Sequence, residues 1–600
     1  MCGIFGYVGT KQVTPLLLEG LKTLEYRGYD SSGIFVPGQE VVKAVGPIDA
    51  LIDKISGDIP GTTGIAHTRW ATHGAATEVN AHPHLDMSGS IAIVHNGIIE
   101  NYREIKEGLS MQGITCESDT DTEVLAKLIG SLYTGDLLAA VRQALHTVRG
   151  TYGLAAASNH QAQQIVVARM GSPIVLGVSP HGTFVSSDPS ALLTHTKNMV
   201  YLEDGECAVI KKDTYKISTI KGESRSRAPE TVEWDVETVQ KQGYEHFMLK
   251  EIFEAPQVIE NAIRGRLLLE EGRAKLGGLE PVLEQISSLN RLMVIGCGSA
   301  YYAGQVGRYM LEEYANLLVE VELGSEYRYK KNLFDKGSAI LAITQSGETA
   351  DTLASIRSAK RQELLTLGIV NVVGSTIARE TSAGVYNHAG PEVAVASTKA
   401  FMSQLTVLVL FTLLVGRERG MTKEEGKEIA CGLHELPKII ETYLANTDDI
   451  KKVASKYASY RDAMYIGRKF HTPIAHEGSL KLKEVTYIHA EAYAGGELKH
   501  GSIAMLDEHF PVIALAPVDD VYEKMVSNIE EARARLAPIL MVTTEGNYRA
   551  TDIADDVLYI PKVHPILQPI VTSIPLQLLA YYIGVEKGLN VDRPKNLAKS

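Results

Sequence analysis

The chain begins Met1-Cys2-Gly3-Ile4-Phe5-Gly6, and Cys2 is its most informative residue. Residues 4–8 are mostly apolar and predict a β-strand directly behind this cysteine. A small residue at position two allows the initiator methionine to be removed, which leaves a thiol and a free α-amino group on one residue. An amine of pKa near ~8 beside a thiol of pKa near ~8.5 is a base next to a nucleophile. The alternative is an incidental cysteine in a buried first strand.

Length and composition indicate a multidomain globular protein. The 600 residues predict roughly three or four domains of about 150 residues each. The chain is 45% hydrophobic and 22% charged, which is ordinary for this class. The net charge of −13 and the lack of a lysine- or arginine-rich block argue against a nucleic-acid partner.

The cysteines and the apolar segments bear on the compartment. Five cysteines are scattered without a CxxC pair, which predicts a reducing, cytoplasmic environment with neither a disulfide framework nor a zinc site. The N-terminus has no basic region followed by an apolar core, so no secretory signal is expected. The longest apolar run, residues 400–416, contains four polar side chains and is short for a membrane span. A helix buried inside a domain is the better interpretation.

The hydrophobic pattern changes twice along the chain. Residues 2–216 combine short β-rich segments with helical patterns at 122–132 and 137–147, without βαβ alternation, which favours antiparallel sheets with helices packed on them. Residues 217–246 are polar and rich in breakers, and they predict a linker.

Beyond residue 285 short, wholly apolar strands alternate with helices, which indicates parallel sheets covered on both faces. Residues 463–467 (Ala-Met-Tyr-Ile-Gly) repeat the pattern of residues 292–296 (Leu-Met-Val-Ile-Gly), so the α/β unit is duplicated. We expect one unit at residues 282–422, a second at 453–592, and a tail at 593–600.

Four polar motifs mark the N-terminal region. They are residues 27–31 (Arg-Gly-Tyr-Asp-Ser), 67–74 (His-Thr-Arg-Trp-Ala-Thr-His-Gly), 95–97 (His-Asn-Gly) and 118–123 (Ser-Asp-Thr-Asp-Thr-Glu). Each has a simpler interpretation: a hairpin turn for the Asn-Gly pair, a helix cap for 118–123, and satisfied loop side chains for the histidines.

Together the motifs supply what glutamine hydrolysis requires. A thiol forms a thioester with the side-chain carbonyl, and an Asn side chain with a Gly N–H stabilises the oxyanion. An arginine suits the α-carboxylate of glutamine and a carboxylate suits its α-ammonium group. Arg69 and Asp121 fit these two roles.

These motifs resemble the glutaminase domain of the glutamine–fructose-6-phosphate aminotransferases, also called glucosamine-6-phosphate synthases. The resemblance implies an N-terminal-nucleophile fold over residues 2–216, with two antiparallel sheets between helical layers (αββα). It implies Cys2 as the nucleophile with its own amine as the base; a retained Met1 converts that amine to an amide, so we expect the species carrying Met1 to be a poor glutaminase. The implied oxyanion hole is Asn96 and Gly97. The implied glutamine-binding residues are Arg69, Trp70, Thr72, His73 and Asp121, with Trp70 gating the departing ammonia.

Two features of the C-terminal half predict a phosphate-ester site. Residues 344–349 (Thr-Gln-Ser-Gly-Glu-Thr) form a strand-to-helix turn whose hydroxyls and N–H groups suit a phosphate, although a plain helix cap is the alternative. Residues 296–299 (Gly-Cys-Gly-Ser) match neither a dinucleotide fingerprint nor a Walker loop, so a nucleotide is not expected. Glu477, Lys481 and Glu484 share one helix face, which is either a functional cluster or a surface ion-pair stripe.

These segments resemble the sugar isomerase (SIS) domains of the same family, and the resemblance covers nearly the whole chain. It implies two three-layer αβα domains with parallel sheets. Glu484 would move a proton between C1 and C2 of the sugar, His500 would assist ring opening, and Lys599 would meet the ketose carbonyl as a Schiff base. The expected sugar-phosphate-binding residues are Thr344, Gln345, Ser346, Thr349, Ser299, Val395, Ser397, Glu477 and Lys481.

The implied activity is glutamine-dependent synthesis of glucosamine 6-phosphate from fructose 6-phosphate, the first step of the hexosamine pathway, with ammonia passed internally between two sites. No cofactor and no metal are expected, and the resemblance implies a homodimer or a larger homo-oligomer.

Two departures from the family pattern leave alternatives open. Residues 298–300 read Gly-Ser-Ala where the family has Gly-Thr-Ser, so one sugar-contacting hydroxyl is missing, and the chain stops at Ser600. A glutaminase coupled to a different sugar-phosphate acceptor is therefore the first alternative. The second is a non-catalytic sugar-phosphate sensor, which predicts a lost base, although Glu484, His500 and Lys599 are all present.

Overall fold

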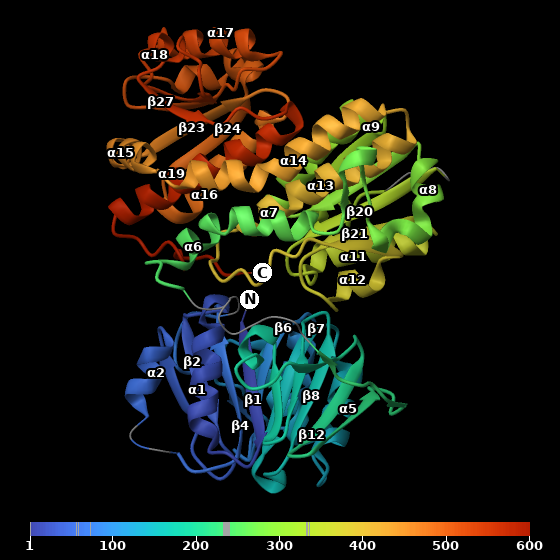
Figure 1. Cartoon of the computed structure of the whole chain (residues 1–600). Helices are drawn as coiled ribbons and strands as arrows, with labels where there is room; N and C mark the ends of the chain where they lie inside the picture. Colours follow the sequence, from blue (N-terminus) through green and yellow to red (C-terminus); the bar gives the residue numbers. More distant parts are fainter. Residues whose placement is uncertain are drawn as a thin grey trace. The chain divides into compact units, whose positions relative to one another are not determined.

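The chain divides into two compact units (Figure 1). Unit 1 comprises Met1–Gln240 and Ala598–Ser600, and unit 2 comprises Lys241–Leu597. The computed structural model describes residues 2–55, 57, 59–71, 74–231, 241–331, 334 and 337–599.

Unit 1 is built on two antiparallel sheets. The first has the order β15-β11-β9-β10-β1-β4-β2-β3 and the second the order β14-β13-β12-β8-β7-β6-β5. The strands of the first sheet are β1 (Gly3–Gly9), β2 (Ser31–Phe35), β3 (Val42–Val45), β4 (Thr63–Arg69), β9 (Val175–Ser179), β10 (Gly182–Ser186), β11 (Asn198–Tyr201) and β15 (Glu230–Thr231). Those of the second are β5 (His84–Leu85), β6 (Ile91–Ile99), β7 (Gly150–Ser158), β8 (Ile165–Met170), β12 (Glu206–Lys211), β13 (Thr214–Thr219) and β14 (Ser224–Arg225).

Helices cover the outer faces of both sheets. Helix α1 packs closely on β1, because a Cβ atom on Gly20 would lie 2.4 Å from the Phe5 ring. The helices are α1 (Val13–Leu24), α2 (Ile48–Lys54), α3 (Tyr102–Met111), α4 (Asp121–Ser131) and α5 (Leu137–Thr147), with short 3-10 helices η1 (Glu25–Arg27), η2 (Asn159–Gln161) and η3 (Pro189–Leu192).

The apolar alternation of β1 builds two cores at once. Phe5 and Tyr7 pack in the cluster that contains the α1 side chains, whereas Ile4 and Val8 pack in a second cluster with residues of both sheets. This arrangement confirms the predicted αββα layering.

The end of unit 1 includes part of the expected linker. Strand β14 pairs with β13, and β15 pairs with β11, so residues up to 231 extend the sheets. Residues 232–240 of that linker lie outside the described residues.

Unit 2 contains two five-stranded parallel sheets with the same topology, β19-β18-β20-β21-β22 and β24-β23-β25-β26-β27. The predicted duplication is therefore confirmed. The strands are β18 (Arg291–Gly296), β19 (Leu318–Leu323), β20 (Ser338–Thr344), β21 (Leu365–Val370), β22 (Ala383–Tyr386), β23 (Asp462–Gly467), β24 (His489–Ala494), β25 (Val512–Leu515), β26 (Ile539–Thr544) and β27 (Asp556–Ile560). A small hairpin joins β16 (Leu267–Leu268) to β17 (Arg273–Ala274).

Helices lie on both faces of these sheets (Figure 1). They are α6 (Phe247–Phe253), α7 (Ala255–Ile263), α8 (Leu283–Ser287), α9 (Ser299–Ala315), α10 (Gly324–Tyr327), α11 (Ala350–Arg361), α12 (Thr376–Glu380), α13 (Lys399–Glu418), α14 (Lys423–Leu444), α15 (Asp448–Tyr457), α16 (His471–Thr486), α17 (Tyr522–Arg533), α18 (Ala550–Ile553) and α19 (Gln568–Glu586). The 3-10 helices are η5 (Leu269–Glu271), η6 (Gly277–Val282), η7 (Gly495–His500), η8 (Ser502–Met505) and η9 (Pro565–Leu567).

The two most apolar helical segments are core elements. Lys399–Glu418 and Pro565–Glu586 are long and apolar enough to cross a membrane, but their most hydrophobic windows are 100% and 94% buried within the protein. The expectation that residues 400–416 form a buried helix is therefore confirmed.

Unit 1 also contains a layer of buried histidines. The rings of His67 and His82 stack 4.1 Å apart, and His84 meets the edge of His82 at 4.9 Å. Burial lowers the pKa of His67 to about 3 and holds the pKa values of His82 and His84 well below their usual range. These imidazoles are therefore neutral in the folded protein near neutral pH.

The first prediction concerns acid stability. Below pH ~6.5 the unfolded chain binds protons that the folded imidazoles reject, so the free energy of unfolding falls as the pH drops from ~6.5 toward ~3. Each buried histidine contributes up to ~1.4 kcal/mol per pH unit to this slope. His82→Gln keeps an acceptor for the His95 N–H group without titrating, so calorimetry should show a shallower pH dependence for the transition of unit 1. The exposed His181→Gln is the control, and an unchanged slope in His82→Gln would contradict the assignment.

Candidate active sites

Cys2 stands at the entrance of β1, beside the end of β4. The register pairs Gly3 with Thr68, so the cysteine reaches the residues that follow Thr68. Its Sγ accepts a hydrogen bond from the Trp70 N–H group at 3.3 Å. Burial raises the pKa of the Cys2 thiol, and the Trp70 N–H group and the Arg69 guanidinium oppose that rise. The thiol is thus held by backbone at the end of the central strand.

Asn96 and Gly97 lie inside β6, which continues to Ile99. Gly97 pairs with Tyr152 on β7, so the interpretation of this pair as a hairpin turn is wrong. The φ angle of Gly97 is +133°, and a Cβ atom there would lie 2.1 Å from the Thr151 carbonyl oxygen, so only glycine fits. Asn96 Nδ2 donates to the Cys2 carbonyl oxygen at 2.9 Å, which brings the amide beside the cysteine.

Arg69 is buried at the end of β4 and organises the next loop. Its guanidinium donates to the carbonyl oxygens of Gly74 at 3.1 Å and Ala75 at 3.2 Å. Trp70 is half-buried beside Cys2. The predicted glutamine-binding residues Thr72 and His73 lie outside the described residues.

Asp121 opens α4, as the sequence predicted. The side chain of Thr120 caps this helix by accepting from Glu123 N–H at 3.2 Å. The helix-cap interpretation of residues 118–123 is therefore correct for Thr120. One carboxylate oxygen of Asp121 accepts from Ile99 N–H at 2.8 Å. This bond fixes the carboxylate against β6, the strand that carries Asn96.

Sequence reasoning gave no role to Arg27 and Asp30, although both belong to the motif at residues 27–31. Arg27 Nε donates to the Cys2 carbonyl oxygen at 3.3 Å, and its NH1 donates to Asp188 at 2.9 Å. Asp30 accepts from Ala71 N–H at 2.8 Å and so holds the residue after Trp70. The charged motif at residues 27–31 was the signal that could have identified Arg27 and Asp30. No local pattern marked Asp188, which lies far along the chain.

The turn at residues 344–349 connects β20 to α11. The Thr344 hydroxyl accepts from Gly347 N–H at 3.1 Å, and the Ser346 hydroxyl accepts from Glu348 N–H at 3.2 Å. Gly347 has a φ angle of +67°, and a Cβ atom there would lie 2.0 Å from Ser375 Oγ. Thr349 precedes the first residue of α11, so this turn presents polar groups at a helix N-terminus.

The helix face predicted to carry Glu477, Lys481 and Glu484 is confirmed on α16, but it is not a surface stripe. Lys481 is buried; its Nζ lies 2.6 Å from a Glu484 oxygen and 3.5 Å from a Glu477 oxygen. Ser299, the first residue of α9, donates to Glu477 at 2.9 Å. These contacts form a buried cluster that links the two repeats of unit 2.

The charges in this cluster control one another. Burial raises the pKa of Glu477 to about 7, although Lys481 opposes the rise. Burial alone would lower the pKa of Lys481, but the two carboxylates outweigh it and raise that pKa. Lys481 therefore stays an ammonium group, and Glu477 can carry a proton near neutral pH.

The other predicted sugar-site residues lie outside the Ser299–Glu477–Lys481–Glu484 cluster. Val395 and Ser397 are half-buried on the loop before α13, where they alternate with buried neighbours, and Val395 N–H donates to the Asp592 carbonyl at 3.0 Å. Gln345 is half-buried in the turn at residues 344–349. His500 is exposed at the end of η7, and its side chain has no hydrogen bond or ion pair to the described residues. Lys599 falls in unit 1, where its N–H donates to the Tyr26 carbonyl at 3.4 Å.

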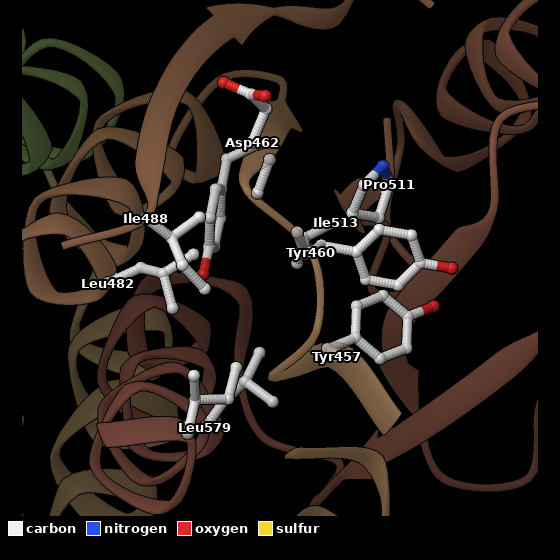
Figure 2. A pocket seen from close by; sticks show the side chains of 11 residues that line it. Tyr457, Tyr460, Asp462, Leu482, Ile488, Pro511, Ile513 and Leu579 are labelled. Carbon is white, nitrogen blue, oxygen red and sulfur yellow. The ribbon is translucent and has the colours of Figure 1, made fainter. Parts of the chain in front are cut away.

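A small apolar pocket lies at the end of the second parallel sheet where strands β23 and β25 begin (Figure 2). The rings of Tyr457 and Tyr460 lie on one wall, and Asp462, the first residue of β23, lies at the edge. The remaining lining residues are Ala463, Tyr465, Leu482, Ile488, Pro511, Ile513, Leu579 and Ile583. Ligands of parallel α/β sheets bind at the carboxyl ends of the strands, so this pocket at the strand starts is not the sugar-phosphate site.

Comparison with known families agrees with both units. Residues 53–219 match the glutamine amidotransferase domain, and residues 285–414 and 456–586 each match the SIS domain.

Similar proteins match along the full chain. A glutamine–fructose-6-phosphate aminotransferase (isomerizing) from Chlorobaculum tepidum is 46% identical, and one from Thermus thermophilus is 47% identical; each match covers 100% of this chain and 99% of the relative. The solved C-terminal domain of glucosamine-fructose-6-phosphate aminotransferase from Francisella tularensis is 35% identical, with a TM-score of 0.57 over 59% of this chain and 99% of that one. The chain belongs to the glutamine–fructose-6-phosphate aminotransferase (isomerizing) family.

Proposed function

We propose that this protein releases ammonia from glutamine at Cys2 and transfers it internally to fructose 6-phosphate, giving glutamate and glucosamine 6-phosphate. One observation carries the proposal: the contact between Cys2 and Asn96 and the buried Ser299–Glu477–Lys481–Glu484 cluster occur on one chain. The first suits amide hydrolysis and the second suits proton transfer on a sugar.

In the glutaminase half the Cys2 sulfur attacks the side-chain amide carbon of glutamine. The C–N bond breaks, the nitrogen takes up a proton and leaves as ammonia, and water then hydrolyses the thioester to glutamate. An amide NH₂ has two N–H groups, so Asn96 can keep its bond to the Cys2 carbonyl and direct the second N–H at the oxyanion. The Gly97 N–H group is the second donor.

The remaining glutaminase residues bind the amino-acid end of glutamine. The Arg69 guanidinium suits the α-carboxylate and the Asp121 carboxylate suits the α-ammonium group. Thr72 and His73 would complete this pocket, and Trp70, which follows Arg69 and contacts Cys2, would gate the departing ammonia.

In the sugar half the turn at residues 344–349 binds the phosphate through Thr344, Gln345, Ser346, Thr349 and the N–H groups that open α11. Glu484 moves the proton between C1 and C2. Lys481 lies 2.6 Å from a Glu484 oxygen and pairs with its charge, while the protonated form of Glu477 relieves the repulsion between the two carboxylates.

Four further residues would complete the sugar site. Lys599 would form the Schiff base with the ketose carbonyl, and His500 would assist ring opening. Val395 and Ser397 would contact the sugar from the loop before α13.

We further propose a cytoplasmic homodimer or larger homo-oligomer. The five cysteines, none of which is paired in the structure's described part, suit a reducing compartment. The exposed His500 needs a cover to act on a sugar, and a second copy of the chain would supply one.

The proposed function is tested by measuring glutamate and glucosamine 6-phosphate with and without fructose 6-phosphate. Coupled formation of both products supports it, and glutamate release without any hexosamine phosphate from a panel of ketose phosphates refutes it. Isotopically labelled free ammonium tests the internal transfer, because ready entry of that label during glutamine-dependent turnover contradicts channelling.

The second prediction separates the two halves. Cys2→Ala should lower glutamine-dependent synthesis by more than about a thousandfold, because the nucleophile is lost. Synthesis from high concentrations of free ammonia should persist, since unit 2 is unchanged. The exposed Cys431→Ala is the control and should keep both activities. Parallel loss of both activities in a folded Cys2→Ala protein would contradict the division.

The third prediction concerns the sugar base. Glu484→Gln should lower hexosamine-phosphate formation by about a hundredfold to ten-thousandfold, because an amide cannot accept the proton. Glutamine hydrolysis at Cys2 should remain measurable. Glu497→Gln, an exposed position on η7, is the matched control. Normal turnover in Glu484→Gln would contradict the assignment of Glu484 as the base that moves the proton between C1 and C2.

The fourth prediction concerns the phosphate turn. Gly347→Ala should raise the KM for fructose 6-phosphate by about tenfold or more, because the new Cβ meets Ser375 Oγ in a left-handed backbone conformation. Gly546→Ala adds a Cβ at a similar φ angle, +82°, with nothing within 4 Å, so it controls for backbone strain alone. Equal KM values in the two variants would argue against phosphate binding at this turn.

A further inference from the structure

The orientation of the Asn96 side-chain amide is fixed by two contacts. On one side Nδ2 donates to the Cys2 carbonyl oxygen at 2.9 Å. On the other side Oδ1 lies 3.0 Å from His67 Nε2. A flipped amide would set Oδ1 against the Cys2 carbonyl, two acceptors at hydrogen-bond distance, which is unfavourable. The observed orientation therefore requires His67 Nε2 to be the donor.

The second nitrogen of His67 agrees with this tautomer. Nδ1 is buried without a partner among the residues that the structure describes. A neutral imidazole with its proton on Nε2 leaves only an acceptor lone pair there, whereas an imidazolium would bury an unpaired N–H donor. The flat stack on His82, 4.1 Å away at 23°, further favours a neutral ring in a fixed plane.

His67 also connects the two sheets of unit 1. It lies on β4, paired with Ile4 on β1 and with Gly33 on β2, and its ring reaches Asn96 on β6 of the second sheet. Strand β4, which ends at Arg69, therefore also directs the amide beside Cys2.

We propose that His67 is a positioning residue for glutamine hydrolysis: its Nε2–H donates to Asn96 Oδ1 and holds the Asn96 N–H groups toward the reacting carbonyl. Without that donor the amide can rotate, and its oxygen can face the oxyanion instead of its N–H. This inference rests on the proposed glutaminase site and assigns a role to a histidine that touches no substrate.

The role predicts an effect on the chemical step. An oxyanion donor acts mainly in the transition state, so loss of its orientation lowers kcat and leaves the KM for glutamine nearly unchanged. A histidine that merely fills space would act through folding, so its replacement would lower the amount of folded unit 1 instead of changing kcat selectively.

Two substitutions separate the donor from the ring. His67→Phe keeps a flat ring against His82 and removes the donor. His67→Gln removes the ring and keeps an N–H group on a side chain of similar reach. Both are made in the full-length protein and again with Asn96→Ala. Glutamate release from glutamine gives kcat and KM, and calorimetry of the unit 1 transition checks that the domain carrying His67 is folded.

The expected result is a kcat for His67→Phe lowered by about tenfold to a hundredfold, with KM within about threefold. His67→Gln should recover at least part of the loss. Asn96→Ala removes the group that His67 orients. In a protein that already carries Asn96→Ala, adding His67→Phe should therefore lower kcat by no more than about a further threefold.

Three results would overturn the proposal: a His67→Phe kcat within twofold of the parent, a His67→Gln protein no better than His67→Phe, or losses that multiply fully with Asn96→Ala. If His67→Phe does not fold, His67→Met takes its place, because it fills the site without a donor. Failure of the underlying site is distinguishable, because Cys2→Ala and Asn96→Ala would then both still hydrolyse glutamine normally.

Discussion

Strand β1 is buried on both faces, and the glutaminase site depends on that burial. Phe5 and Tyr7 face the layer of α1, and Ile4 and Val8 face the second sheet. Four large side chains, each stabilising by about 1.5 to 3 kcal/mol when buried, anchor a strand of seven residues. Cys2 directly precedes this strand, so its backbone is fixed before any side chain of the site contributes. A residue outside a buried strand and near a chain end would otherwise be more mobile.

The sugar half relies on a different constraint, a cluster of charged groups that compensate one another, in which Glu477 and Lys481 are buried and Glu484 is half-buried. Lys481 lies between Glu477 and Glu484 in a region where a single buried charge would be strongly destabilising. Apolar residues of similar volume would stabilise the fold at least as well, so stability does not explain this cluster. Control of the proton affinity of Glu477 is the better explanation, because burial raises the pKa of this carboxyl while the Lys481 ammonium group and the Ser299 hydroxyl oppose the rise.

The sequence predicted what depends on local pattern, and it failed where residues meet across the fold. The helix at residues 137–147, the duplicated α/β unit and the shared face of Glu477, Lys481 and Glu484 follow from periodicity alone. Whether that face was buried could not follow from it, because burial comes from α9, which lies far away in the chain.

At the Asn96–Gly97 pair, a local pattern predicted a structure that tertiary contacts prevent. This dipeptide is a typical hairpin signal, but tertiary pairing with β7 overrides it and keeps the strand extended. The partners of Cys2 come from residues separated from it by tens of positions, as with Asn96 and Trp70. No local pattern encodes such separations.

The two repeats of unit 2 have the same topology but carry different polar residues at corresponding positions. The turn after β20 carries the hydroxyls of Thr344 and Ser346, whereas the corresponding turn after β25 carries Asp519 and Asp520. Asp519 caps its own turn through Val521 N–H at 3.0 Å, and Asp520 pairs with Lys469 at 2.9 Å. Two carboxylates repel a phosphate, so the second repeat is not suited to bind one there.

The second repeat instead supplies helix α16 with its buried charges, and its counterpart in the first repeat, α9, supplies only Ser299. The bond from Ser299 to Glu477 joins these two helices. A phosphate held by the first repeat would thus lie in the same unit as a base supplied by the second. Under the proposed assignment neither repeat alone contains both groups, so the sugar site requires the two repeats together.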